Sequence, residues 1–306
     1  MQANRWWVYQ RERFPLCKNG LLILAFSASA LTYSRLLRGE YVFSDIKAYS
    51  VAFITALMYF MQLRIADEFK DFDEDTKYRP YRPVPRGLVT LKELGWVFVI
   101  GSFLQVILAL WLHPPLIILL LITWLYLAGM SKEFFVREWI KAHPITYLWT
   151  HMLIMPLVDL YITSCDWLVK GYTQPPEGIV WFLTVSFFNG ILLEFGRKIR
   201  AKEDEEEGVE TFTVLWGISK ASFAWLLALT LNFIAMLMAA KQSETLLFCF
   251  ALLMLPYFFG IWVITRFYKQ PQSKHAKSIE TFSGLWTLAM YVTLGPLAMG
   301  FNMLTR

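Results

Sequence analysis

Residues 46–75 read IKAYSVAFITALMYFMQLRIADEFKDFDED, a mostly apolar run that passes directly into a dense group of acids. The first part, residues 46–66, is long enough to cross the ~30 Å hydrocarbon core of a bilayer as a helix. The last nine residues carry six carboxylates, which repel one another and resist burial unless a cation such as Mg²⁺ neutralises them. The sequence therefore predicts a membrane helix that ends in a metal-binding segment at the bilayer surface.

The rest of the chain is also strongly apolar. Of its 306 residues 57% are hydrophobic, whereas a soluble domain has about 45–50%. Backbone polar groups in lipid must be bonded within their own segment, so apolar runs of spanning length are expected to be helices. We expect one all-α domain over residues 1–306, a polytopic bundle of nine transmembrane helices around a central cavity. The nine runs lie near 19–37, 46–66, 93–113, 115–130, 144–164, 178–196, 219–240, 244–265 and 281–303.

The lysines and arginines gather between alternate runs. If the N-terminus is cytoplasmic, most of the 29 lie in cytoplasmic segments, including the two charged segments 67–92 and 197–220. We therefore expect a multi-pass protein of the cytoplasmic membrane whose charged loops cap the bundle on the cytoplasmic side. The net charge of +5 reflects this loop bias, and it suits attraction to anionic lipid. It therefore does not call for a nucleic-acid partner, and none is expected.

A second group of residues extends the acidic segment. Residues 79–90 read RPYRPVPRGLVT, and arginines of this kind hold phosphate groups by paired hydrogen bonds. Acids, a metal and phosphate together indicate an enzyme that acts on a diphosphate at a membrane surface. Both charged segments then reach a Gly-x-x-Thr before a new helix, at 87–90 and at 208–211. Because the segments lie four helices apart, a parallel internal repeat would place both at the same end of the bundle.

The first motif resembles the signature of the UbiA superfamily of intramembrane prenyltransferases, Asn-Asp-x-x-Asp-x-x-x-Asp followed by Arg-Pro-x-Pro-x-Gly. Without gaps, Asp67 takes the Asn position and the three acids fall on Glu68, Asp71 and Asp75, which share one face of a continuous helix. Residues 82–87 reproduce the second element, two residues early. The resemblance covers the whole chain. It implies Mg²⁺ as cofactor, an isoprenyl diphosphate as substrate, and a lipophilic acceptor, phenolic or a quinone precursor, taken up from the lipid bilayer.

The second motif is similar to that of the family only in part. The family has Asp-x-x-Asp-x-x-x-Asp before Gly-x-x-Thr, and anchoring on 208–211 puts Arg197, Arg200 and Asp204 at the acidic positions. A shift of three residues recruits Glu194 as an acidic ligand instead. Either acids form a second metal site, or cations hold the diphosphate directly, and we favour a mixed site. The acids concerned are Glu194, Glu203 and Asp204, and the cations are Arg197, Lys198 and Arg200.

The resemblance and helical spacing together assign roles to individual residues. The predicted catalytic residues are Asp67, Glu68, Asp71, Asp75, Arg197 and Asp204. The predicted metal ligands are Glu68, Asp71, Asp75, Glu194 and Asp204. The predicted substrate-binding residues are Arg64, Lys70, Arg82, Lys132, Glu194, Lys198 and Arg200. Candidate acceptor contacts are Tyr126, His151 and Tyr161.

Two other functions stay open. Some members of the same superfamily cyclise the prenyl cation instead of transferring it, so a membrane terpene cyclase is the alternative. Release of diphosphate without an added acceptor would indicate a cyclase. In another class, the chain would be a transporter or lipid-binding protein without chemistry. Against that, the ion sites of transporters lie near the bilayer midplane, whereas these carboxylates gather at one surface.

Overall fold

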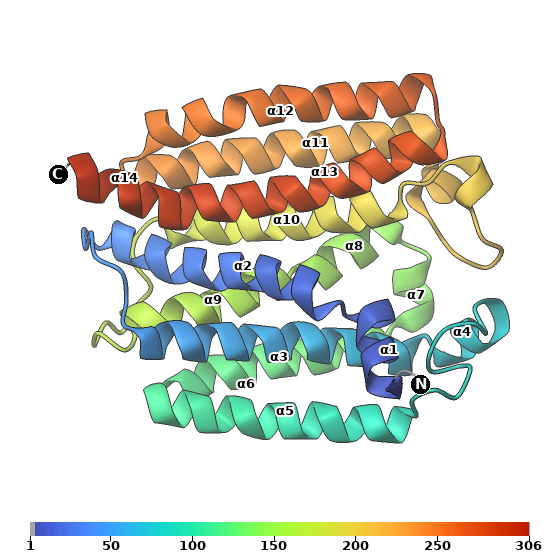
Figure 1. Ribbon diagram of the computed structural model, residues 1–306, viewed down its shortest axis with the longest axis horizontal. Helices are drawn as coiled ribbons and strands as arrows, with labels where there is room; N and C mark the ends of the chain where they lie inside the picture. Colours follow the sequence, from blue (N-terminus) through green and yellow to red (C-terminus); the bar gives the residue numbers. More distant parts are fainter. Residues whose placement is uncertain (1–3, 306) are drawn as a thin grey trace.

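The computed structural model describes residues 4–305, which form a bundle of helices along a common axis (Figure 1). Within these residues there is no strand. The helices are α1 (Arg5–Arg13), α2 (Leu16–Leu37), α3 (Ile46–Lys70), α4 (Phe72–Tyr78), α5 (Leu91–Leu112), α6 (Leu116–Ser131), η1 (Glu133–Phe135), α7 (Arg137–Lys141), α8 (Pro144–Met152), α9 (Ile154–Trp167), α10 (Ile179–Lys198), η2 (Lys202–Asp204), α11 (Phe212–Gln242), α12 (Leu246–Lys269), α13 (Ser273–Val292), η3 (Thr293–Leu297) and α14 (Ala298–Thr305).

The expected class, an all-α polytopic membrane protein, is confirmed. Within residues 4–305, eight helical segments are long and apolar enough to cross a membrane. Two of them are composite, since α8 with α9 forms one and α13 with η3 and α14 forms another. The remaining expected span corresponds to α6, which is apolar but has only 16 residues. A ninth crossing therefore stays a prediction.

The two Gly-x-x-Thr elements have the same local structure. Gly87 and Gly208 both have a positive φ, which a residue without a Cβ adopts easily. Thr90 then caps α5 by accepting a hydrogen bond from the backbone of Glu93, and Thr211 caps α11 in the same way. Each charged segment thus closes with a left-handed glycine that turns the chain into a capped membrane helix.

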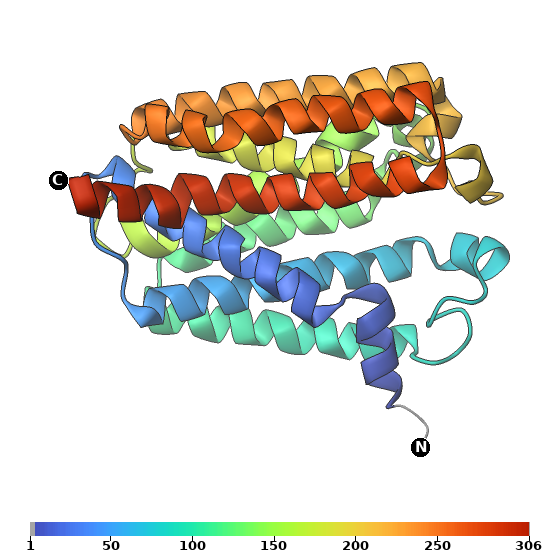
Figure 2. The same ribbon diagram turned by 45° about the horizontal axis from the view of Figure 1, so that its top comes forward.

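Both charged segments lie at one end of the bundle. In Figures 1 and 2 the end of α3 and the end of α10 face the same side, together with α1, α4 and α7, while the C-terminus lies at the opposite end. This agrees with the expectation from a spacing of four helices. Which side of the membrane this end faces stays a prediction.

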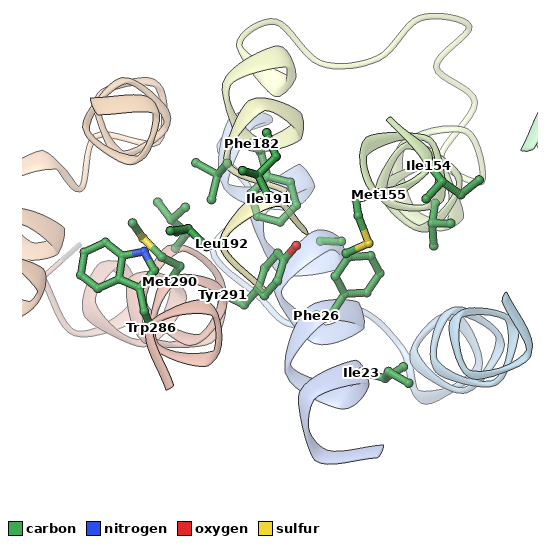
Figure 3. Close-up of a cluster of buried hydrophobic side chains, with 14 of the residues drawn as sticks. Ile23, Phe26, Ile154, Met155, Phe182, Ile191, Leu192, Trp286, Met290 and Tyr291 are labelled. Carbon is green, nitrogen blue, oxygen red and sulfur yellow. The ribbon is translucent and has the colours of Figure 1, made fainter. Parts of the chain in front are cut away.

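The middle of the bundle holds α10 in place. Helix α10 packs against α11, α13 and α9. Figure 3 shows the buried side chains where α2, α9, α10 and α13 meet, with the Tyr291 ring 5.2 Å from Phe26 and 6.0 Å from Phe182 between ring centroids. Interlocked aromatic rings of this kind resist displacement. The end of α10, which carries the second motif, is therefore fixed relative to α2 and α13.

Candidate active site

The first part of the site is the last turn of α3. Three charged side chains lie on it at helical spacing: Arg64, Asp67 and Lys70. The Asp67 carboxylate is 3.6 Å from Arg64 and 3.9 Å from Lys70, measured between nitrogen and oxygen. The three residues face one side of the helix because residues three apart are neighbours on its surface. The turn therefore presents one carboxylate between two cations.

The second part of the site is the last turn of α10. The Glu194 carboxylate accepts a hydrogen bond of 2.6 Å from the Arg197 guanidinium and lies 3.0 Å from the Lys198 ammonium. Arg197 and Lys198 end the helix, where cations also interact favourably with its dipole. This turn again combines one carboxylate with two cations.

Tyr147 on α8 joins the two parts. Its hydroxyl accepts a 2.8 Å hydrogen bond from the Lys70 ammonium, and its ring centroid lies 5.9 Å from the Lys198 ammonium. Asp67 also interacts electrostatically with Arg197 across the gap. The ends of α3 and α10 thus form one cluster with four cations and two carboxylates, which suits an anionic ligand.

Asp71 is the free carboxylate beside this cluster. Its backbone N–H bonds to the Asp67 carbonyl, so it lies one turn further on, and none of the ion pairs among residues 4–305 includes it. Burial raises the pKa of the Asp71 carboxyl above its ordinary value, Lys70 opposes this, and the carboxylates of Asp67 and Asp75 add to it. A partly buried acid among other acids is stabilised by a bound cation.

These residues fit a magnesium ion that is shared with a substrate. Within residues 4–305 no group of three His, Cys, Asp or Glu side chains is arranged as a ready metal cage. Mg²⁺, however, is usually held by one or two carboxylates together with substrate phosphates and water. Asp71, without a cation partner, and Asp67, whose nearest cations are at 3.6 and 3.9 Å, meet that requirement.

Two predicted ligands have arginine partners instead. Glu68 is 2% exposed and forms an ion pair with Arg13, at the end of α1. Asp75 is also 2% exposed and lies 2.8 Å from Arg79 and 2.7 Å from Arg82. These pairs attach α1 to α3 and fold the Arg-Pro segment onto α4. Neither arrangement supports the direct metal contact predicted for these two acids, nor the grip on an anion predicted for Arg82.

We expect Glu68→Gln to lower the stability of the protein and to leave its Mg²⁺ requirement for turnover nearly unchanged. Removing one partner of a buried ion pair leaves the other charge uncompensated, which costs about 3 kcal/mol. Because Arg13 ends α1, trypsin should then cut after Arg13 faster, as followed by mass spectrometry. The control is Glu12→Gln, since Glu12 pairs with Arg86 at an exposed position and such pairs contribute at most about 1 kcal/mol. A large rise in the Mg²⁺ requirement with unchanged proteolysis would contradict the bracing role.

The other predicted site residues lie outside the cluster. Arg200 bonds to the Asp204 carbonyl and the Glu206 carboxylate, both at 3.3 Å, and so stays within its own loop. The Asp204 carboxylate accepts a hydrogen bond from the Ser273 hydroxyl at the start of α13. Lys132 is exposed at the end of α6. Of the two registers left open for the second motif, the one that includes Glu194 meets the first motif.

Sequence reasoning missed two residues, Tyr147 and Arg13. Tyr147 and His151 lie four residues apart in the span that begins at Pro144, and their rings stack with centroids 3.9 Å apart. Such a polar pair on one face of a membrane helix is a usable signal for a site. Arg13 gave no signal, because its partner lies 55 residues away in the chain.

An apolar groove of about 610 Å³ has Phe134, whose ring meets His151 edge-on, in its wall. Side chains from α6, η1, α9 and α10 line it, including Tyr126, Phe134, Leu157 and Leu183. Leu125 in its wall is 73% exposed, so the groove is open to the surface that faces lipid. A central cavity stays a prediction, whereas this lateral groove suits a hydrocarbon chain.

The comparisons with known proteins concern the family and the fold. The model of the UbiA prenyltransferase family matches residues 29–287. The chain is similar to the apo structure of a UbiA homolog from Aeropyrum pernix K1, with 15% identity and a TM-score of 0.66 over 93% of this chain and 98% of that one. It is also similar to a structure of digeranylgeranylglyceryl phosphate synthase, with 17% identity and a TM-score of 0.57 over 90% and 98%. No curated protein sequence matches the chain significantly.

Proposed function

Because the chain belongs to the UbiA prenyltransferase family, we propose that it is a Mg²⁺-dependent intramembrane prenyltransferase. It transfers an isoprenyl group from a prenyl diphosphate to an aromatic or other lipophilic acceptor and releases diphosphate. The observation that carries the proposal is the meeting of the α3 and α10 ends, where cations outnumber carboxylates at one end of a membrane bundle. That end faces the cytoplasm, the source of soluble diphosphate substrates.

The diphosphate lies between the two helix ends. Arg64 and Lys70 contact it from α3, and Arg197 and Lys198 contact it from α10. Guanidinium groups bind phosphate oxygens by two parallel hydrogen bonds, which fixes the direction of the head group as well as its place. Glu194 orients Arg197 and Lys198 through the bonds already described.

Asp67 and Asp71 are the residues that would hold a magnesium ion shared with the diphosphate. Mg²⁺, when bound, neutralises the negative charge that develops on the leaving group. The two carboxylates would fix its position at the end of α3, where Lys70 supplies a further positive charge near Asp67. The four cations of the cluster stabilise the same developing charge without rearrangement, because the ion pairs already hold them in place.

Departure of the diphosphate leaves an allylic cation on the prenyl chain. The C1–O bond breaks and its electron pair leaves with the diphosphate. The apolar lining of the groove excludes water, which would otherwise capture the cation as an alcohol. The ring faces of Tyr126 and Phe134 stabilise positive charge at close range. Attack by the electron-rich acceptor then completes the transfer.

Terpene cyclisation needs the same ionisation and is the second candidate. The observation that favours it is that Arg197 and Arg200 stand at two acidic positions of the second motif, which sets this chain apart from the family pattern. A transporter or lipid-binding protein would bind the same diphosphate without breaking its C1–O bond. Cleavage of the C1–O bond separates the two enzymes from a binding protein, and the fate of the prenyl cation separates the transferase from the cyclase.

The test is diphosphate release by the purified protein in detergent. Geranyl, farnesyl and geranylgeranyl diphosphates are supplied with Mg²⁺, first alone and then with phenolic or quinone-precursor acceptors, and EDTA removes the metal in a parallel sample. We expect Mg²⁺-dependent release only when an acceptor is present. Release without an acceptor, together with a cyclic hydrocarbon, would identify a cyclase. Binding without release under every condition would overturn the proposed activity.

A further inference from the structure

His151 is a buried histidine between the charged cluster and the apolar groove. It lies on α8 one turn after Tyr147 and is 7% exposed. Its ring stacks on Tyr147 on one side, and Phe134 meets it edge-on with ring centroids 6.3 Å apart. Since Tyr147 bonds to Lys70 and Phe134 lines the groove, His151 connects the charged cluster to the groove wall through its two ring contacts.

The hydrogen bonds of His151 determine which nitrogen carries the proton. Its Nδ1 lies 2.8 Å from the backbone carbonyl oxygen of Tyr147. A carbonyl oxygen only accepts, so Nδ1 is the protonated nitrogen of the neutral ring and Nε2 carries a lone pair. The Thr150 hydroxyl, at 3.5 Å from Nδ1, already donates to the Thr146 carbonyl at 2.6 Å. The neutral ring therefore presents Nε2 as a hydrogen-bond acceptor.

Nothing in the described residues 4–305 satisfies that acceptor. Nε2 is fully buried and makes no hydrogen bond there. Buried polar atoms almost always have a partner, so an unpaired one at a ligand site points to a group that the ligand supplies. The partner required by Nε2 is a donor, such as the hydroxyl of a phenol or a ring C–H that becomes acidic during reaction.

The wall beside His151 is held in an unusual backbone conformation. Glu133, Phe134 and Phe135 all have positive φ angles between 48° and 62°. Three consecutive non-glycine residues in this region are costly, and such strain concentrates at functional sites. Here the turn places Phe134 against both Tyr126 and His151. The strained turn therefore holds Phe134 in place between the groove and His151.

We propose that His151 is the base that takes the proton from the acceptor during prenyl transfer, a role that rests on the proposed function. The prenyl C1–O bond breaks with its electron pair going to diphosphate, and the acceptor forms a bond to C1. The acceptor's O–H or C–H bond breaks, its electrons return to the acceptor, and its proton goes to Nε2. The imidazolium then loses this proton to water after product release. The charged groups that face His151 are Lys70 and Asp67 from α3 and Glu194 from α10.

The experiment compares two fates of the prenyl cation in His151→Gln. Diphosphate release needs no base, whereas transfer to the acceptor does. We expect the variant to release diphosphate but to form prenyl alcohol, so that the ratio of prenylated acceptor to prenyl alcohol falls about 100-fold. Both products come from the same folded molecules, so a loss of folded protein does not change the ratio. If His151→Gln yields no folded protein, His151→Ala with added imidazole gives the same readout, with the ratio rising as imidazole is added.

His143→Gln is the matched control. His143 also bonds through Nδ1 to the carbonyl four residues earlier and stacks on the aromatic ring of Trp139, but it is exposed. Its replacement should leave the ratio unchanged. An unchanged ratio in His151→Gln, at whatever total rate, would overturn the role of His151 alone. Failure of the unsubstituted protein to release diphosphate would instead overturn the proposed function, and the role of His151 with it.

Discussion

Replacing Asp71 by Asn is expected to lower kcat/KM for the prenyl diphosphate about 1,000-fold, because metal-assisted charge stabilisation of about 4 kcal/mol is lost. Of the four residues aligned with the family motif (Asp67, Glu68, Asp71 and Asp75), only Asp71 has no ion pair within residues 4–305. The carboxylates around it disfavour its charge unless a cation is bound. Asn keeps the size of the side chain and removes the charge. Turnover would be measured as diphosphate release across a Mg²⁺ titration, and the Mg²⁺ concentration for half-maximal rate should rise.

The control for this prediction is Asp73→Asn. Asp73 lies two residues away in the same acidic segment, is exposed, and takes part in none of the ion pairs among residues 4–305. The same chemical change there should leave turnover within about twofold, since solvated charges contribute little. Thermal unfolding of both variants should match that of the unsubstituted protein. Near-normal turnover in Asp71→Asn, or equal losses in both variants, would refute Asp71 as a magnesium ligand.

The membrane helices and the meeting of the two charged segments were predictable from the sequence. Apolar runs fix helix positions in lipid because the backbone has no other way to satisfy its hydrogen bonds. A spacing of four helices then puts both charged segments at one end, where Figure 1 shows them. Lys70 and Arg64 could be placed beside Asp67 from helical spacing alone, and the ion pairs follow that spacing.

It was not predictable from the sequence which acids pair with arginine and which face α10. Helix geometry explains why. Successive residues on a helix point about 100° apart, so Asp67 and its neighbour Glu68 cannot both face α10. Glu68 faces α1 instead and forms an ion pair with Arg13. The expectation for Asp75 assumed one continuous helix, but α3 ends at Lys70 and α4 begins at Phe72. Because of this break, Asp75 lies close to Arg79 and Arg82, its neighbours in sequence, and forms ion pairs with both.

The register of the second motif needed the fold for a similar reason. Helix α10 ends at Lys198, so Arg200 lies in the link that follows and Asp204 in the short helix η2, and neither continues the face of α10. Helix η2 is tied to the start of α13 instead, where Glu203 accepts a hydrogen bond from the Ser273 backbone and Asp204 accepts one from its hydroxyl. An alignment anchored on Gly208 carries no information about where α10 ends. The contrast that we predict between Arg197 and Arg200 follows from this difference in position.

We expect Arg197→Gln to lower kcat/KM for the prenyl diphosphate about 100-fold, since hydrogen bonds to charged groups contribute about 1.5–3 kcal/mol each. Arg197 ends α10 beside Asp67, so its loss removes a guanidinium from the diphosphate and leaves Glu194 with Lys198 alone. Arg200→Gln is the matched control, because it removes the same group three residues later from a loop contact, and a loss below about fivefold is expected for an exposed ion pair. Arg197→Lys should fall between the two, because it keeps the charge but cannot bond to phosphate in a bidentate manner.

Steady-state diphosphate release measures all three variants, and isothermal titration with inorganic diphosphate and Mg²⁺ measures the head-group affinity directly. Equal losses in Arg197→Gln and Arg200→Gln would show that the α10 end does not hold the diphosphate, and the cation cluster would then be a structural link between α3, α8 and α10.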